Sequence, residues 1–322
     1  MSSNVFPISV AECADRLLAV SSAAVVTHIR PDGDTVGTSV ALCKALEAMG
    51  KDAVLIPADP VPERLAFLTA GVKIADTPSN RTVITCDVAS PAQLGAMYEK
   101  LVNIDLSIDH HSVSAPFAPH LTIGDSSSAA EVLYLVIREL EARGALKMSA
   151  DIAYPLYAAI SSDTGGFMYS SATPDTYRAA AELMECGIDY SDINHRLFNS
   201  KSEKQIKAEG FVAEKMICDG NLSYVIITLA DRARLGIESE YLDTAIDVVR
   251  ARLGTEIAFT LKELEAGKYR VSLRSTGYNV AEIAGMFSGG GHVRAAGCTV
   301  SADSPEAAVN MLKDAIKSKG ND

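Results

Sequence analysis

The chain has 322 residues, of which 48% are hydrophobic and 22% charged, the composition of an ordinary globular protein. Its net charge is −12, and residues 1–200 carry most of it, with 24 acidic side chains against 13 basic ones. This balance disfavours a long nucleic-acid duplex as a partner, because binding one requires a broad basic surface. No apolar run approaches the ~20 residues that span a membrane.

The first ten residues and the cysteines bear on the location of the protein. Residues 1–10 lack the basic start and the apolar core of a signal peptide. The six cysteines are scattered without a Cys-x-x-Cys pair, which is typical of reduced thiols and not of a zinc ribbon. We therefore expect a cytoplasmic protein with no membrane partner.

The first part of the chain alternates apolar strands with helices. We expect strands at residues 24–27, 53–57, 82–85, 104–108 and 157–160, and helices at residues 34–50, 91–102 and 129–143. Further helices are expected at residues 174–187, 191–199 and 202–218. This order predicts an α/β fold with a mostly parallel sheet and helices on both faces.

A smaller α/β or α+β domain is expected at the end of the chain. Its strands are predicted at residues 222–229, 256–264, 269–275 and 298–301, and its helices at 242–253, 281–287 and 305–317. The charge-rich helix around residues 201–215 is expected to connect the two domains. We place the first domain at 1–188, the helical linker at 189–218 and the second domain at 219–322.

Potential metal ligands follow the predicted strands of the first domain. They are His28, Asp32 and Asp34, then Asp87, then Asp109, His110 and His111, and finally Asp163. The carboxyl ends of parallel strands meet at one edge of a sheet, so these side chains are expected to lie together. Four aspartates at positions 32, 34, 87 and 163 carry about −4, which two divalent ions compensate. Two divalent metal ions bound side by side are common in enzymes that hydrolyse phosphate esters.

Each of these segments alone has an ordinary structural explanation. Asp32 and Asp87 precede predicted helices and can act as caps, and Asp163 can be a turn residue. Residues 109–111 alone could form a solvated turn. In a metal site, one of the two histidines there binds the ion, the other faces the substrate, and Asp109 can orient a histidine. The whole set favours the metal interpretation.

A glycine-rich stretch near the end of the chain is the second functional signal. It reads Gly289-Gly290-Gly291-His292-Val293-Arg294-Ala295-Ala296-Gly297. Glycines let the backbone approach an anion, and their N–H groups can bind phosphate oxygens. His292 and Arg294 add donors, and arginine binds phosphate bidentately. A flexible hairpin is the alternative. Arg274 ends a predicted strand and either joins this site or is an exposed edge residue.

The aspartate and histidine segments resemble the four motifs of the DHH phosphoesterase superfamily. Residues 289–297 resemble the signature of the first type of C-terminal domain associated with it. The resemblance covers nearly the whole chain and is closest to the compact nanoRNases (oligoribonucleases), which also dephosphorylate 3′-phosphoadenosine 5′-phosphate. It implies a DHH catalytic domain at 1–188 and a DHH-associated substrate-binding domain at 219–322.

The resemblance also implies a role for each candidate residue. His28, Asp32 and Asp87 would hold one Mn²⁺ ion, and Asp34, Asp87, His110 and Asp163 would hold a second. Mg²⁺ and Co²⁺ are the alternative metals. His111 and Asp109 would be catalytic, with His111 facing the scissile phosphate. The substrate-binding residues would be Arg274, Gly289, Gly290, Gly291, His292 and Arg294.

Together these inferences predict a manganese-dependent phosphoesterase. It would hydrolyse short RNA oligonucleotides to mononucleotides and 3′-phosphoadenosine 5′-phosphate to AMP. Two alternatives stay open: a linear or cyclic dinucleotide phosphodiesterase, and a nucleotide-sensing binding protein. The expected partners are short RNA and small nucleotides, and a homodimer is compatible with the sequence.

Overall fold

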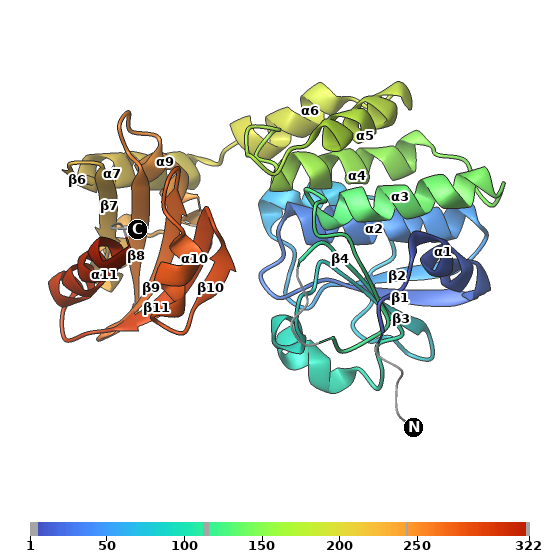
Figure 1. Cartoon of the computed structure of the whole chain (residues 1–322), viewed down its shortest axis with the longest axis horizontal. Helices are drawn as coiled ribbons and strands as arrows, with labels where there is room; N and C mark the ends of the chain where they lie inside the picture. Colours follow the sequence, from blue (N-terminus) through green and yellow to red (C-terminus); the bar gives the residue numbers. More distant parts are fainter. Residues whose placement is uncertain (1–5, 112–115, 243, 320–322) are drawn as a thin grey trace. The chain divides into compact units, whose positions relative to one another are not determined.

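The computed structural model describes residues 6–111, 116–242 and 244–319. The chain divides into two compact units, Met1–Ser200 and Lys201–Asp322 (Figure 1). The helices α6 (Tyr190–Asn194) and η3 (His195–Asn199) belong to the first unit, and α7 (Glu203–Lys215) belongs to the second. No helix within the described ranges has both the length and the apolar character needed to cross a membrane.

A parallel sheet forms the centre of the first unit. Among the described residues its five strands have the order β2-β1-β3-β4-β5. Their bounds are Ser22–Val26 (β1), Asp52–Ile56 (β2), Thr82–Cys86 (β3), Leu106–Asp109 (β4) and His120–Thr122 (β5). Strands β1 to β4 are almost continuously buried, which fits their apolar sequences because parallel sheets are covered on both faces. The predicted α/β fold is confirmed.

Helices cover both faces of this sheet. One face carries α1 (Val10–Ala19), α2 (Gly33–Ala48), α3 (Ala129–Ala142) and α4 (Ala150–Asp163), which share a large apolar core with the strands. Helices α5 (Pro174–Glu185) and α6 pack on α4 and form the outermost layer (Figure 1). The opposite face packs against the 3₁₀ segment η2 (Pro91–Lys100), and η1 (Glu63–Thr69) packs on α2.

The structure corrects the predicted strand at residues 157–160. These residues lie in the last turns of α4, a helix buried along most of its length. A short apolar run is compatible with a strand or with a fully buried helix, and periodicity alone does not distinguish them. The alanines of this segment suit the helix, which contains Pro155 despite the backbone donor that a proline removes. The predicted helix at 91–102 is the 3₁₀ segment η2, which Gly95 interrupts at φ +52°.

The second unit is built on a mixed sheet. Among its described residues the six strands have the order β10-β11-β9-β8-β7-β6. Their bounds are Ile217–Asp219 (β6), Leu222–Ile227 (β7), Ile257–Glu265 (β8), Lys268–Ser275 (β9), Gly290–His292 (β10) and Ala295–Ser301 (β11). The helical segments are α7, α8 (Leu229–Leu235), η4 (Ser239–Leu242), α9 (Ala245–Arg250), α10 (Val280–Gly285) and α11 (Pro305–Lys319). Strand β6 corrects the predicted helix at 202–218, which ends at Lys215.

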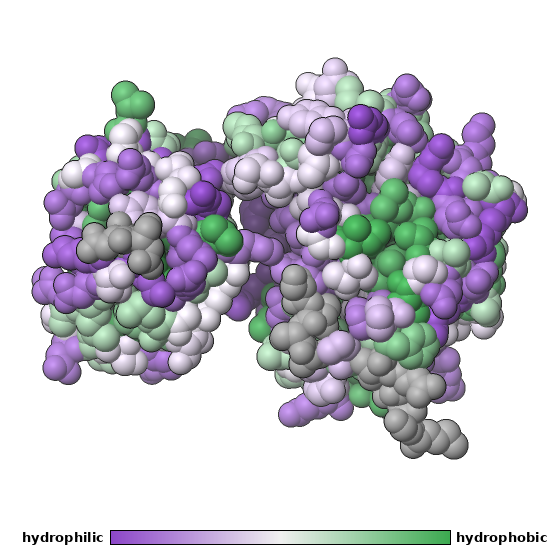
Figure 2. All heavy atoms as spheres, viewed as in Figure 1, coloured by the Kyte–Doolittle hydropathy of each residue, from purple (hydrophilic) through white to green (hydrophobic). Residues whose placement is uncertain are grey.

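The two faces of this second sheet have different covers. Helices α10 and α11 pack over one face through a core that includes Phe259, Tyr269 and Leu273. Helices α7 and α9 cover the other face and pack there against strands β7 and β8. Polar side chains dominate much of the surface in Figure 2, in keeping with the high net charge of the chain.

Candidate metal centre

Three adjacent strands deliver the polar segments to one edge of the first sheet. The segment from His28 to Asp34 follows β1, and Asp87 follows β3. Asp109 is the last residue of β4, and His110 and His111 come directly after it. After β1 the chain continues through α2 to β2, which pairs with one edge of β1. The next strand, β3, pairs with the opposite edge of β1, so the strand order reverses here. Ligand sites in open parallel sheets occur at such reversals of strand order.

Asp163 reaches this edge from a helix and not from a strand. It is the last residue of α4, and α4 packs closely on α2. Gly33 and Gly37 on α2 permit this approach: a Cβ on Gly33 would lie 2.2 Å from Ser162 Oγ, and one on Gly37 would lie 2.6 Å from the Pro155 carbonyl oxygen. The two glycines therefore allow Asp34 and Asp163 to meet, a role that the sequence analysis missed.

The first group of potential ligand atoms consists of His28, Asp32 and Asp87, within 4.8 Å of one another. His28 Nδ1 is bonded to the Ile29 carbonyl oxygen at 2.8 Å, so this nitrogen is the donor. His28 Nε2 then faces Asp32 Oδ1 at 3.7 Å and Asp87 Oδ2 at 3.3 Å. Asp32 also caps α2 by accepting from the N–H groups of Asp34 and Thr35.

The second group consists of Asp34, His110 and Asp163. His110 Nδ1 is bonded to the Ser126 carbonyl oxygen at 3.2 Å, and its Nε2 lies 4.0 Å from Asp34 Oδ2 and 3.7 Å from Asp163 Oδ2. His28 and His110 thus share one arrangement, in which Nδ1 donates to a carbonyl and Nε2 points at carboxylates. This arrangement is usual for histidines that bind a metal through Nε2.

Asp87 lies between the two groups. Its Oδ2 faces His28 at 3.3 Å, and its Oδ1 lies 3.8 Å from His110 Nε2. The residue adopts a left-handed backbone conformation, with φ +59°, immediately after β3. Such a backbone is uncommon outside glycine and tends to occur at functional sites. One carboxylate oxygen is therefore directed at each group, as a bridging ligand requires.

His111 has a different arrangement from the other two histidines. Its Nδ1 is bonded to Asp109 Oδ1 at 2.9 Å and lies 3.4 Å from Asp87 Oδ1. Asp109 is fully buried, and the same Oδ1 accepts from the N–H groups of His110 and His111. Asp109 therefore fixes the orientation of the His111 ring through Nδ1.

The electrostatics of the cluster favour cations. Burial, followed by repulsion from Asp87, raises the pKa of Asp34 and of Asp163 well above the usual range. Burial lowers the pKa of His28, but its contacts with Asp32 and Asp87 outweigh this effect and raise it to about 11. Full ionisation of these carboxylates is thus unfavourable in the metal-free cluster and would be favoured by an added cation.

Two observations show that the residues fit divalent metal ions. Buried Asp87 Oδ1 accepts no hydrogen bond from any described residue, which leaves a lone pair available to a ligand. Carboxylate oxygens and neutral imidazole nitrogens are donors that suit Mn²⁺ and similar ions. The ionised aspartates and the Nε2 atoms of His28 and His110 would hold the metal.

The glycine-rich stretch lies in the second unit. Gly290–His292 form edge strand β10, paired antiparallel with β11, so the predicted loop is partly a strand. The register places His292 opposite Ala295, and Ala295 opposite Arg274 on β9. Leu273 and Ala296 belong to the core beneath α10 and α11. Because side chains alternate along a strand, His292 and Arg274 lie on the opposite, shared face.

The other predicted substrate-binding residues surround this strand. All three residues of β10 are exposed. Arg294 lies in the turn between β10 and β11, and its Nη1 donates to the Tyr278 carbonyl oxygen at 3.2 Å. Gly289 lies directly before β10, where a Cβ would come within 2.3 Å of the Gly297 carbonyl oxygen. The stretch is therefore a tightly paired hairpin with an exposed face.

Comparisons with known proteins identify relatives of both units. Residues 22–160 match the family model described as the DHH family, N-terminal domain, and residues 221–318 match the DHHA1 domain. The bifunctional oligoribonuclease and PAP phosphatase NrnA of Thermus thermophilus is 31% identical over 299 residues, covering 91% of this chain and 88% of the relative. The Bacillus subtilis protein of the same name is 26% identical over 277 residues, covering 85% and 87%.

A solved structure shares the fold of the whole chain. The crystal structure of an exopolyphosphatase-related protein from Bacteroides fragilis superposes with a TM-score of 0.84 and covers 96% of each chain at 21% sequence identity. At this level of identity the similarity concerns the fold.

Proposed function

This chain belongs to the DHH family of metal-dependent phosphoesterases, as its motifs predicted, and on that premise we propose that it hydrolyses short RNA oligonucleotides to mononucleotides. We also propose that it removes the 3′-phosphate of 3′-phosphoadenosine 5′-phosphate. The names and lengths of the relatives support both activities, since the chain covers 88% of the Thermus protein. Family membership makes it an enzyme, which sets aside the alternative of a nucleotide-sensing binding protein.

The observation that carries the proposal is the position of Asp87. Its two oxygens are directed at the two groups of ligand atoms, one containing His28 and the other containing His110. We propose that these groups hold two Mn²⁺ ions, with Mg²⁺ or Co²⁺ as substitutes. Divalent ions in such a site activate a water molecule and neutralise charge that develops on the phosphoryl oxygens.

His111 and Asp109 are proposed to act on the reacting phosphate. Burial lowers the pKa of His111, but Asp109 and Asp87 outweigh this and raise it to about 11, which favours the protonated imidazolium. Asp109 holds Nδ1, and we propose that Nε2–H donates to a phosphoryl oxygen or to the leaving oxygen. This role corresponds to the substrate-facing histidine that the sequence predicts.

The second unit is proposed to bind the substrate. Gly290 and Gly291 are proposed to offer backbone N–H groups, and His292, Arg274 and Arg294 side-chain donors, on or beside strand β10. The N–H of Gly289 donates to the Ala284 carbonyl oxygen at 2.9 Å, so the proposed role of Gly289 is to let the backbone approach the phosphate closely. We propose domain bounds of 1–188 for catalysis and 219–322 for substrate binding, joined by residues 189–218. No broad basic surface follows from the composition, so short substrates are favoured over long duplexes.

A substrate panel with Mn²⁺ tests the proposal. It contains RNA of 2, 5 and 24 residues, linear and cyclic dinucleotides, 3′-phosphoadenosine 5′-phosphate and pyrophosphate. Release of mononucleotides from the dinucleotide and pentanucleotide should far exceed release from the 24-residue RNA, and 3′-phosphoadenosine 5′-phosphate should yield AMP. Chelator-treated protein controls for metal-independent ribonucleases. Equal efficiency on the longest RNA, or cleavage of cyclic dinucleotides alone, would contradict the proposed substrate.

A further inference from the structure

One turn behind the metal centre contacts two of the proposed ligands at once. It comprises residues 126–130, at the start of α3. The Ser126 carbonyl oxygen is bonded to His110 Nδ1 at 3.2 Å. The N–H groups of Ala129 and Ala130 donate to Asp34 Oδ2 at 2.7 Å and to Asp34 Oδ1 at 3.1 Å. The turn therefore orients a ligand from α2 and a ligand from the end of β4.

The carboxylate of Glu131 holds this turn from within the protein. Glu131 is 6% exposed, and its Oε2 accepts from Ser127 N at 3.0 Å and from Ser127 Oγ at 2.5 Å. A third donor, Thr176 Oγ1 on α5, lies 2.8 Å away. Three donors on one oxygen offset much of the cost of burying a carboxylate.

The contacts of Glu131 differ from an ordinary helix cap. Ser128 is the N-cap residue of α3 and accepts from Glu131 N at 3.1 Å. In a capping box the acidic side chain would return to the N–H of the cap residue itself. Here it reaches one residue further back, to Ser127, and extends sideways to α5. The carboxylate thus ties the turn to a second helix, which stabilising α3 alone does not require.

We propose that Glu131 is a positioning residue of the metal centre. It holds the 126–130 turn in the shape that keeps Asp34 and His110 aimed at the same ion. Without the carboxylate, three buried donors lose their acceptor and the turn relaxes, so both ligands lose their orientation together. The inference rests on the proposed metal centre but names a residue outside it, since Glu131 reaches Asp34 and His110 only through the turn.

The test measures binding of Mn²⁺ alone to metal-free protein by isothermal titration calorimetry, together with the Tm of each variant. Glu131→Ala should bind Mn²⁺ roughly 10- to 100-fold more weakly, the usual effect of losing a residue that orients a metal ligand. Glu131→Gln should retain most of the affinity. Its amide oxygen can accept the same three donors, and no described residue donates to Glu131 Oε1, where the amide nitrogen would lie.

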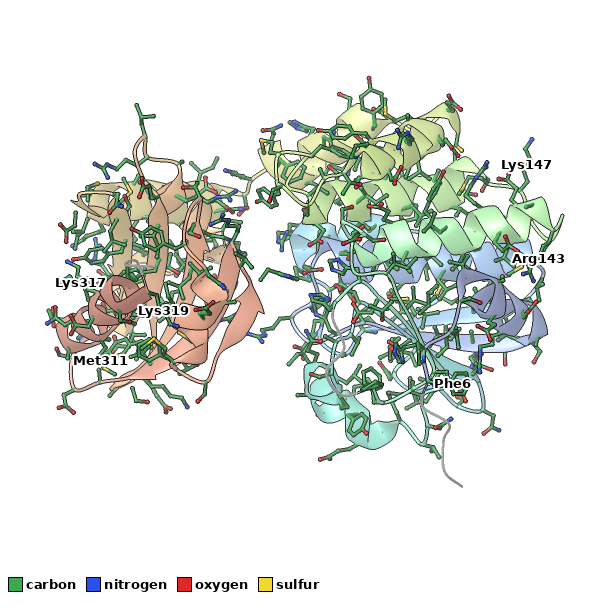
Figure 3. The ribbon with its side chains drawn as sticks, viewed as in Figure 1. Phe6, Arg143, Lys147, Met311, Lys317 and Lys319 are labelled. Atoms are coloured by element: carbon green, nitrogen blue, oxygen red, sulfur yellow. The ribbon has the colours of Figure 1, made fainter. Side chains whose placement is uncertain are left out.

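Two controls separate positioning from general stability. Glu182 on α5 accepts from Tyr134 Oη at 2.6 Å and lies 3.4 Å from Arg138 Nε, so it joins the same two helices away from the turn. Leu140 is fully buried near the C-terminal end of α3, which Arg143 caps (Figure 3). Glu182→Ala and Leu140→Ala should lower the Tm and leave the affinity for Mn²⁺ unchanged.

Activity gives an independent readout. At low Mn²⁺ the kcat of Glu131→Ala should fall with its metal occupancy, and excess Mn²⁺ should restore most of it while KM for the dinucleotide stays unchanged. If Glu131→Ala does not fold, Ser127→Ala provides the test. It removes the hydroxyl that donates to Glu131 Oε2 at 2.5 Å, and it should show a smaller loss of Mn²⁺ affinity at a nearly unchanged Tm.

Several results would overturn the inference. The first is that Glu131→Ala binds Mn²⁺ with wild-type affinity. The second applies if Glu131→Ala is unfolded, and it is that folded Ser127→Ala binds Mn²⁺ with wild-type affinity. The third is that Leu140→Ala, at a matched Tm, loses as much Mn²⁺ affinity as Glu131→Ala. If the wild-type protein itself binds no Mn²⁺, the proposed metal centre fails instead, so the two failures are distinguishable.

Discussion

The acidic cluster of the first unit and the glycine strand of the second unit are both proposed to act on phosphate, yet they are built in opposite ways. Asp34, Asp87 and Asp109 are at most 4% exposed, and their oxygens face histidines or backbone N–H groups. The residues of β10 are all exposed, at the edge of a sheet. The first site is a mostly buried network whose most exposed members are Asp32 and Asp163, and the second is an exposed strand with side-chain donors.

This difference predicts how each site responds to change. A buried charge that loses its partner leaves an uncompensated group in a low dielectric, and its neighbours shift with it. A donor on an exposed strand can be removed without disturbing the others, and water replaces the lost contact. Substitution of a buried aspartate of the cluster should therefore abolish function, whereas substitutions on the exposed strand should have graded effects.

The largest effect is expected from Asp87→Ala, which tests the buried network. It removes the carboxylate whose two oxygens face the two ligand groups. Turnover should fall by more than the roughly 100-fold that loss of an orienting residue costs, and the content of bound Mn²⁺ should drop. The matched control is Asp105→Ala, since Asp105 lies just before β4, outside the cluster, and accepts from Val83 N on β3. Near-normal activity with two bound ions would disprove the assignment.

A smaller effect is expected from His292→Ala on the exposed strand. Loss of one charge-assisted phosphate contact costs roughly 1.5–3 kcal/mol, or about 10- to 150-fold in kcat/KM. Two Mn²⁺ ions should stay bound, because the change lies in the other unit. His195→Ala, a change at an exposed histidine of the first unit, is the control. Loss of an ion, or unchanged kinetics on dinucleotide and 3′-phosphoadenosine 5′-phosphate, would show that the strand has another role.

Two neighbouring glycines sharpen the comparison within the strand itself. Gly291 has φ +141°, and a Cβ there would lie 2.5 Å from the Ala295 carbonyl oxygen, whereas a Cβ on Gly290 meets no described atom within 4 Å. Gly291→Ala should therefore destabilise the hairpin by roughly 1–3 kcal/mol. Gly290→Ala should keep the Tm but raise KM a few-fold by obstructing the approach of a phosphate. An unchanged KM in Gly290→Ala would argue against backbone binding of the substrate.

The smallest expected effect is the release of protons when Mn²⁺ binds. In metal-free protein the pKa of His28 is raised to about 11 and that of Asp34 lies well above its usual range, so both retain protons that the unfolded chain would lose at lower pH. Metal binding requires neutral imidazole and ionised carboxylate, so protons must leave. Calorimetry at pH 7 in buffers of different ionisation enthalpy should show net release, with affinity falling as the pH is lowered. A buffer-independent enthalpy would contradict the expected coupling.

Much of the first unit could be predicted from local patterns. The strand before Asp87 and the helix after Asp32 were recognisable because apolar runs and helical periodicity are properties of neighbouring residues. Asp163 was assigned to the correct edge for the wrong reason, since its segment is a buried helix. The glycine stretch was recognised by composition, but its pairing as strand β10 depends on β11.

The sequence by itself determined which ligand types this protein possesses and the order in which β1, β3 and β4 present them, because those features depend on residues close together in the chain. Only the tertiary structure decided how the ligands are aimed. Asp34 is held by N–H groups 95 and 96 residues away, and His110 by a carbonyl 16 residues away. Glu131 accepts a hydrogen bond from Thr176, 45 residues further along the chain. Such contacts form only when separate elements pack, so no local pattern records them.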